Sequence, residues 1–361
     1  MNRTTRILAM LSLAALSPAC EDVEGVPTGS GGAGGSTPTT AGTGGTSNGG
    51  TAGASTGGTG GGMTTGGTGG ASNGGSGGGG AGGTGGTGGA AGYSFTVVKG
   101  FTGAESCLWD PVSEHWYVSN IAPPVSGDLT ELDGEGWISK VDKDLNLVEE
   151  KWVMGLDTPA GLRLLNGELF VCNISQIHGF EVATGDLVET HIFPSAVFLN
   201  DPAIDAAKDM VYATDTFGDA IYEMKIGQVG SEALLVASAE LMGPNGLLFD
   251  GGKLYVGSLV DFNPANLGPF LSVNPNSKAI TQVGTTLGKW DGLEKWQGAY
   301  LLSDNAAGKL VLIQPGGTSE VLFDLFTDHG FAPAADIGVD PATGTICVPN
   351  LGDSVGFITV N

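Results

Sequence analysis

The feature that most constrains this chain is a phrase that recurs six times between residues 105 and 350. Each copy has a polar residue, small residues, an apolar pair, a turn and an apolar strand that ends in Asn, Asp or Ser. The copies end at Asn120, Asn173, Asp215, Ser258, Asp304 and Asn350. These ends are 53, 42, 43, 46 and 46 residues apart, which is the size of a four-stranded propeller blade. The repeat predicts an all-β fold, a six-bladed β-propeller over residues 93–361.

A ring of blades has to be closed, because an open first or last sheet leaves unpaired strand edges. The segment Tyr93–Val98 is predicted to be a strand that completes the last blade beside Val355–Val360. Two packed sheets would account for the same strand content, but not for the repeat period. Four tryptophans are interpreted as packing in the blade cores: Trp109, Trp116, Trp137 and Trp296.

The polar residue that opens each copy is expected to face the central channel, because the innermost strand of every blade lines it. The six positions are Glu105, Ala160, Asn200, Asn245, Asp291 and Asp336. Carboxylate and amide oxygens are hard donors, so their convergence predicts a calcium or magnesium site. The alternative is that Asn245-Gly246 and Asp291-Gly292 only form turns, where both dipeptides are favoured. Spacing alone leaves the two interpretations open.

The whole domain resembles the six-bladed propeller family of gluconolactonase and regucalcin (senescence marker protein). Four short motifs carry the resemblance: Glu105 before Leu108-Trp109-Asp110-Pro111, then Asn200-Asp201, Pro244-Asn245-Gly246 and Asp291-Gly292. The resemblance implies that Glu105, Asn245 and Asp291 are ligands of a divalent metal, calcium by preference. It also implies that Asn200 lies beside the metal or the substrate, and that Asp291 is the catalytic base toward water.

The chain departs from the family's motifs in several places, and Phe198 is the departure with the clearest chemical consequence. The family's sugar-acid lactonases carry an arginine two residues before the substrate asparagine, and Phe198 occupies that position here. A benzyl group cannot donate a hydrogen bond. Phe198 is therefore assigned to substrate binding, predicts a more apolar ligand and argues against hydrolysis of sugar lactones.

The first 19 residues have the pattern of a signal peptide: a basic start, a short apolar run and small residues before Cys20. The apolar run is about half of the roughly 20 residues that cross a bilayer as a helix. The segment Leu16–Cys20 resembles the bacterial lipoprotein cleavage box, with Ser17 where a leucine is usual. Cys20 is therefore predicted to be lipidated; ordinary cleavage with an unmodified Cys20 is the alternative.

Residues 20–92 are predicted to be a flexible tether, since 33 of the 67 residues from Val26 to Gly92 are glycine and such a chain cannot bury a core. The domain that follows carries 12 basic and 35 acidic residues, a net charge of −23. This charge repels nucleic acid and anionic lipid and suits cation binding. We expect an exported cell-envelope protein that contacts the membrane only through a lipid anchor.

Three cysteines of the domain, Cys107, Cys172 and Cys347, each lie in an apolar strand-like run. They are interpreted as buried free thiols, and their odd number leaves at least one unpaired in any case. Among the histidines, His329 is best placed for acid–base chemistry. No nucleophile pairs with it in the sequence, so a role without catalysis is favoured.

Two functions stay open at this point. A metal-dependent hydrolase of a lactone or ester would use Asp291 as its base. A noncatalytic propeller would keep calcium as a structural ion and bind an extracellular protein or glycan. Propellers host both roles, so the fold does not decide. Ligand-sized space above the metal favours the enzyme, and a site filled by side chains favours the binding protein; a monomer is expected in both cases.

Overall fold

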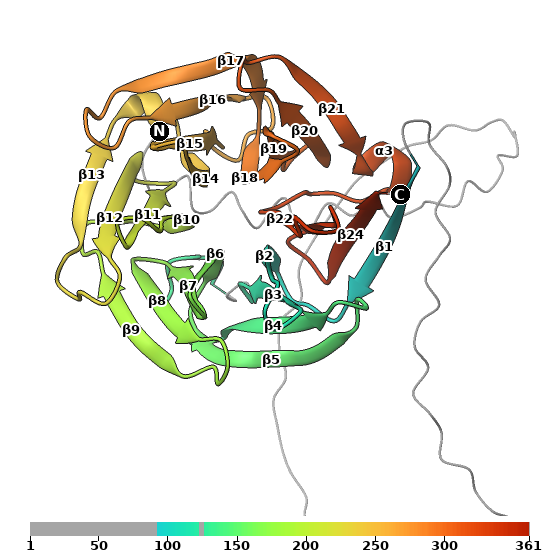
Figure 1. Ribbon diagram of the computed structural model, residues 1–361, viewed down its shortest axis with the longest axis horizontal. Helices are drawn as coiled ribbons and strands as arrows, with labels where there is room; N and C mark the ends of the chain where they lie inside the picture. The colour runs from blue at the N-terminus through green and yellow to red at the C-terminus, as the bar shows by residue number, and fades with distance from the viewer. Residues whose placement is uncertain (1–91, 123–125, 361) are drawn as a thin grey trace, which may run out of the picture. The chain divides into compact units, whose positions relative to one another are not determined.

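The computed structural model describes residues 92–122 and 126–360. They form six four-stranded antiparallel sheets, which stand as the blades of a ring (Figure 1). The predicted six-bladed propeller is confirmed. The predicted signal peptide, the lipidated Cys20 and the tether lie outside the described residues. Within these residues, no helix is both long and apolar enough to span a membrane.

Five blades are each built from four consecutive strands, ordered from the channel outwards. Blade 1 comprises β2 (Ala104–Asp110), β3 (His115–Asn120), β4 (Gly136–Asp142) and β5 (Leu147–Leu156). Blade 2 comprises β6 (Pro159–Leu165), β7 (Glu168–Asn173), β8 (Gln176–Glu181) and β9 (Leu187–Ile192). Blade 3 comprises β10 (Leu199–Asp205), β11 (Met210–Asp215), β12 (Ala220–Lys225) and β13 (Ala233–Ala237). Blade 4 comprises β14 (Pro244–Asp250), β15 (Lys253–Ser258), β16 (Gly268–Val273) and β17 (Ile280–Gly288). Blade 5 comprises β18 (Trp290–Trp296), β19 (Ala299–Asp304), β20 (Lys309–Ile313) and β21 (Ser319–Asp324).

The sixth blade joins the two ends of the domain. It comprises β22 (Gly338–Val339), β23 (Ile346–Pro349), β24 (Ser354–Val360) and β1 (Tyr93–Lys99). Strand β1 pairs with β24 along its whole length, from Tyr93 opposite Val360 to Lys99 opposite Ser354. Closure of the ring by the leading strand is therefore confirmed.

A short helix, α3 (Leu325–His329), packs against this closure, and a 3-10 turn, η1 (Ala239–Leu241), precedes β14. The hydroxyl of Tyr93 donates a hydrogen bond to Asp328 Oδ2 at 3.1 Å. The ring of Phe95 stacks on His329, with 4.4 Å between the ring centroids. His329 thus helps to hold β1 in place.

The apolar core lies between neighbouring blades. Each of six apolar clusters combines residues of two adjacent blades. Trp116, Trp137 and Trp296 are buried in the blades as predicted, whereas Trp109 is only partly buried. Because each blade is packed on both faces, the innermost strands β2, β6, β10, β14, β18 and β22 are fixed around the centre of the ring (Figure 1).

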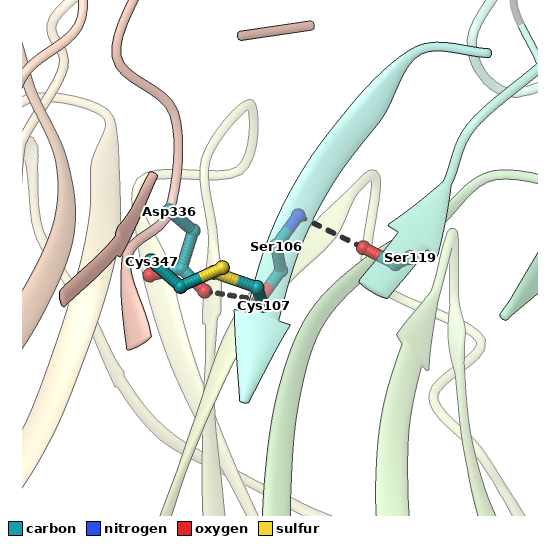
Figure 2. Close-up of a disulfide and its surroundings, with 5 residues drawn as sticks. All are labelled: Ser106, Cys107, Ser119, Asp336 and Cys347. Atoms are coloured by element: carbon teal, nitrogen blue, oxygen red, sulfur yellow. Dashed lines mark hydrogen bonds between the residues drawn. A yellow bond between two sulfur atoms is a disulfide. The ribbon is translucent and has the colours of Figure 1, made fainter. Parts of the chain in front are cut away.

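A disulfide links Cys107 of β2 to Cys347 of β23, across the junction of blades 1 and 6 (Figure 2). The prediction that these two residues are free thiols is wrong. They are 240 residues apart in the sequence, so only closure of the ring brings them together. Cys172 is free and buried, as predicted.

Candidate functional site

An irregularity of the innermost strands sets the position of the channel-facing side chains. Five of these strands shift register against their neighbour near their first residues, at the same place in each blade. In β2, β10, β14 and β18 the shift brackets Glu105, Asn200, Asn245 and Asp291 respectively. A bulge of this kind turns a side chain out of the regular alternation. The repeated polar residue is thus presented at one end of the channel.

The glycines after two of these residues have a packing role. A Cβ on Gly246 would lie 2.3 Å from the carbonyl oxygen of Asp291, and one on Gly292 would lie 2.3 Å from the backbone nitrogen of Ile337. Both contacts are too short for any side chain. Asn245-Gly246 and Asp291-Gly292 lie within strands β14 and β18, so the alternative that they only form turns is wrong.

Four side chains at this end of the channel present buried oxygen atoms without a hydrogen-bond donor, which are atoms of the kind that a cation can bind. Glu105, Asn200, Asn245 and Asp291 have exposed fractions of 7%, 1%, 2% and 4%. Within the described residues, Glu105 Oε2 and the Oδ1 atoms of the other three accept no hydrogen bond. Buried oxygens without a donor are costly, and a hard divalent cation satisfies such oxygens directly. We call these four atoms the oxygen set.

The oxygen set is half neutral, because two of its members are amides. Among the described residues, no group of three or more His, Cys, Asp or Glu side chains is arranged to hold a metal ion. Only Glu105 and Asp291 contribute carboxylates here, and the other two oxygens come from asparagine. Mixed carboxylate and carbonyl donors are characteristic of calcium, whereas zinc prefers nitrogen and sulfur.

Asn305 orients the carboxylate of Asp291. Its side-chain amide donates a hydrogen bond to Asp291 Oδ2, and Asn305 is only 8% exposed. The other carboxylate oxygen, Asp291 Oδ1, belongs to the oxygen set. Asn305 thus holds one oxygen of Asp291 and leaves the second directed to a different partner.

Below the oxygen set, Arg163 connects four blades. Its guanidinium lies 3.0 Å from Glu294 Oε1 and 3.6 Å from Asp201 Oδ2. It also donates hydrogen bonds to the carbonyl oxygens of Leu247 at 3.1 Å and Leu293 at 3.3 Å. These partners belong to blades 3, 4 and 5, while Arg163 itself belongs to blade 2. The side chain therefore crosses the channel.

Asp336 occupies the junction of blades 6 and 1. Its side chain is fully buried, and Oδ2 accepts a hydrogen bond from the Ser106 hydroxyl (Figure 2). Its backbone nitrogen donates to the carbonyl oxygen of Glu105 at 3.0 Å. Because Ser106 lies between Glu105 and Cys107, the disulfide and these hydrogen bonds together fix the strand that carries Glu105.

The buried carboxylates of the channel raise one another's pKa. Burial raises the pKa of Glu105 well above its usual range, and the charges of Asp291, Asp336 and Asp201 add to this rise. Burial and Asp336 raise the pKa of Asp291 to about 7, against the opposing amides of Asn305 and Asn245. Burial raises the pKa of Asp336 to about 7, with Arg163 opposing. The channel thus concentrates negative charge, and a divalent cation would relieve the repulsion.

The predicted substrate residue Phe198 belongs to an apolar cluster beside the oxygen set. It is 3% exposed and packs with Ile121, Leu129 and Phe217. The rings of Phe198 and Phe217 have centroids 5.1 Å apart. These residues come from connections at the end of the channel where the inner strands begin. An apolar cluster thus contributes to the end of the channel at which the oxygen set lies, and the role of Phe198 in substrate binding stays a prediction.

Comparisons with known protein families and with curated proteins find no match for this chain. Solved structures share its fold. A gluconolactonase from Xanthomonas campestris superposes with a TM-score of 0.54 at 13% identity, over 74% of this chain and 90% of that protein. A structure described as a candidate gluconolactonase superposes with a TM-score of 0.55 at 16% identity, over 73% of this chain and 90% of the other.

The fold is that of the gluconolactonase-like six-bladed propellers. A Bacteroides thetaiotaomicron protein of unknown function shares it as well, with a TM-score of 0.54 at 11% identity, over 74% of this chain and 76% of that one. At sequence identities of 11% to 16%, these similarities show a shared fold and no more. The resemblance to gluconolactonases inferred from the sequence motifs agrees with it.

The structure brings Glu105, Asn200, Asn245 and Asp291 to one end of the channel. Ala160 shares this position in its strand but offers no oxygen. Sequence reasoning missed the roles of Arg163 and Asn305. Arg163 could have been noticed, since it is the only arginine after residue 6. Asn305 carried no signal, because its contact with Asp291 depends on how β18 and the end of β19 face each other.

Proposed function

We propose that this propeller is an exported, lipid-anchored and monomeric metal-dependent hydrolase of apolar lactones or esters. The oxygen set on four inner strands carries the proposal, since four buried oxygens without donors suit a hard divalent ion such as calcium. When bound, such an ion would polarise the carbonyl of the substrate. The gluconolactonase-like fold makes a lactonase-type activity a reasonable class to test.

The chain's own residues supply the remaining chemistry. Burial and Asp336 raise the pKa of Asp291 to about 7 without a bound ion, and a cation would lower it again, so that the carboxylate would be ionised and available as a general base at neutral pH. The carboxylate of Asp291 takes up a proton from water, while Asn305 keeps this carboxylate from rotating. Asn200 and Asn245 present uncharged oxygens, which add ligand contacts without adding charge. The cluster around Phe198 supplies apolar surface at this end of the channel.

Two variants at neighbouring ligands test this assignment. Asp291→Asn keeps an oxygen donor but removes the basicity, so turnover should vanish even at calcium concentrations that saturate the variant. Asn245→Asp adds charge without touching the base, so some turnover should remain. Calorimetric titration with calcium gives the saturating concentrations. Full recovery of activity by calcium-saturated Asp291→Asn would make Asp291 a ligand only.

The second candidate function is a noncatalytic propeller that keeps a structural calcium and binds an extracellular protein or glycan. The deep burial of the oxygen set favours it, because every member is less than a tenth exposed. Calcium at a hundred times its dissociation constant should stabilise the protein by about 2.7 kcal/mol relative to EDTA in either case. A broad lactone and ester panel without any turnover, with calcium bound, would favour this second function.

Substrate preference provides a further test of the hydrolase. Phe198 takes the place of a hydrogen-bonding arginine and lies in an apolar cluster. Hydrolysis of gluconolactone should therefore be weak or absent, whereas alkyl-substituted lactones or aryl esters are turned over. Rapid hydrolysis of gluconolactone would contradict the role given to Phe198.

A further inference from the structure

A large cavity lies at the other end of the channel, where the inner strands end. Its volume is about 1010 Å³, in the range of pockets that hold small molecules. Each member of the oxygen set is the second residue of one of four inner strands, for example Glu105 in β2. The cavity is lined by residues near the other end of the same strands, such as Trp109. Along β2, Trp109 follows Glu105 by four residues, so the cavity lining and the oxygen set are roughly 13 Å apart along the strand.

The wall of the cavity is formed by the apolar pairs that follow the polar residue in the repeat. Six of these side chains come from three inner strands and are only partly buried: Leu108, Trp109, Leu164, Leu165, Leu248 and Phe249. Ile204 of a fourth strand lines the cavity as well. Partly exposed apolar side chains that converge on one concave surface favour an apolar ligand, because each gains by losing contact with water.

Arg163 separates the cavity from the oxygen set. Its guanidinium pairs with Asp201, the neighbour of Asn200, and it also lines the cavity together with Glu294. The Arg163–Glu294 pair places hydrogen-bonding groups beside the apolar pairs in the wall of the cavity. One end of the channel thus carries carboxylates that suit a cation. The other end carries the apolar pairs together with the Arg163–Glu294 ion pair.

The charged side chains inside the cavity already have partners in the protein. Glu294 is paired with Arg163, and both oxygens of Asp110 accept backbone hydrogen bonds of its own turn. Lys140 lies over the ring of Trp152, 4.1 Å from its centroid, and 3.9 Å from Glu149. Another acid of the lining, Glu181, is exposed to water. An anionic ligand would meet the carboxylates of the lining and would have to displace Glu294 from Arg163 or Glu149 from Lys140, whereas a neutral ligand would not.

We propose that this cavity is a second ligand site, which binds a neutral and largely apolar small molecule. The body of the ligand lies against the apolar pairs, and a hydroxyl, amide or carbonyl group faces the Arg163–Glu294 pair. The site is independent of the proposed hydrolase activity and of the metal.

The test uses the full chain and two fluorescent probes of similar size, neutral N-phenyl-1-naphthylamine and an anionic anilinonaphthalene sulfonate. The neutral probe should bind saturably with one site per chain, and the anionic probe at least about tenfold more weakly. EDTA should leave binding of the neutral probe unchanged. Binding without saturation, or equal binding of both probes, would overturn the proposal.

Two variants locate the site. Phe249→Ser removes part of the wall, and Ala183→Trp narrows the cavity from its exposed rim without removing a packed side chain. Each variant should weaken the binding of the neutral probe by about tenfold or more. The matched controls are Phe326→Ser on α3 and Ala342→Trp in the exposed turn between β22 and β23, which should bind as the wild type does. If Phe249→Ser does not fold, Ala183→Trp decides, and its unchanged affinity would refute the site.

Discussion

Removing the Cys107–Cys347 disulfide should lower the stability of the propeller by about 5 kcal/mol. The bond closes a loop of 240 residues, and the loss of chain entropy in the unfolded state grows with the logarithm of that number. For a domain of this size, unfolding entropy near 0.6 kcal/mol per degree converts the loss into a fall in melting temperature of about 9 °C. The variant is Cys107→Ala with Cys347→Ala.

Thermal denaturation followed by circular dichroism measures the change, and mass spectrometry under non-reducing conditions verifies the bond in the wild type. Cys172→Ala is the control, because it deletes a buried sulfur that forms no disulfide. Twice the stability lost in Cys172→Ala estimates the part of the loss in the double variant that comes from removing the packing of two sulfur atoms. A double variant that loses no more than this amount would refute the view that the bond stabilises by closing the ring.

Three further predictions concern closure, the orientation of Asp291 and pH. Deleting residues 1–92 should leave a soluble monomer, and deleting Tyr93–Val98 as well should lower its melting temperature by opening blade 6; equal melting temperatures would contradict closure by β1. Asn305→Leu keeps the shape of the side chain but removes the donor, and should weaken calcium binding by about 10- to 100-fold in calorimetry. Asn173→Leu, in blade 2, which contributes no oxygen to the set, should leave calcium binding unchanged. The pKa of Asp336 is raised to about 7 in the folded state, so the folded protein binds a proton between about pH 4 and 7 that the unfolded chain has released. The metal-free protein should therefore be more stable at pH 5 than at pH 8 by at most about 3 kcal/mol from this group, as measured by guanidinium unfolding. A stability that rises over this interval would contradict the buried, protonated carboxyl.

Local patterns in the sequence are sufficient to predict the propeller fold and the residues that supply the oxygen set. A blade is a local unit of about 45 residues, so its strands and turns repeat as a readable period, and the strand that precedes the first copy supplies the missing partner of the last. The polar residue of each copy falls at the same point of a blade. Equivalent points of all blades face one axis, and Glu105, Asn200, Asn245 and Asp291 could therefore be grouped without any knowledge of contacts.

The contacts between blades depended on the tertiary structure. Cys107 and Cys347 lie in different blades, and their pairing follows from the angle at which the closed ring brings β2 to β23. The same holds for Arg163, whose partners come from three other blades, and for Asn305 beside Asp291. A one-dimensional pattern records which residues occur at each level of a blade, but it does not record which side chains of different blades reach each other. The apolar pairs of the repeat show this most clearly: in the sequence they serve only to define the repeat, whereas the ring brings six of their side chains together around a cavity opposite the oxygen set.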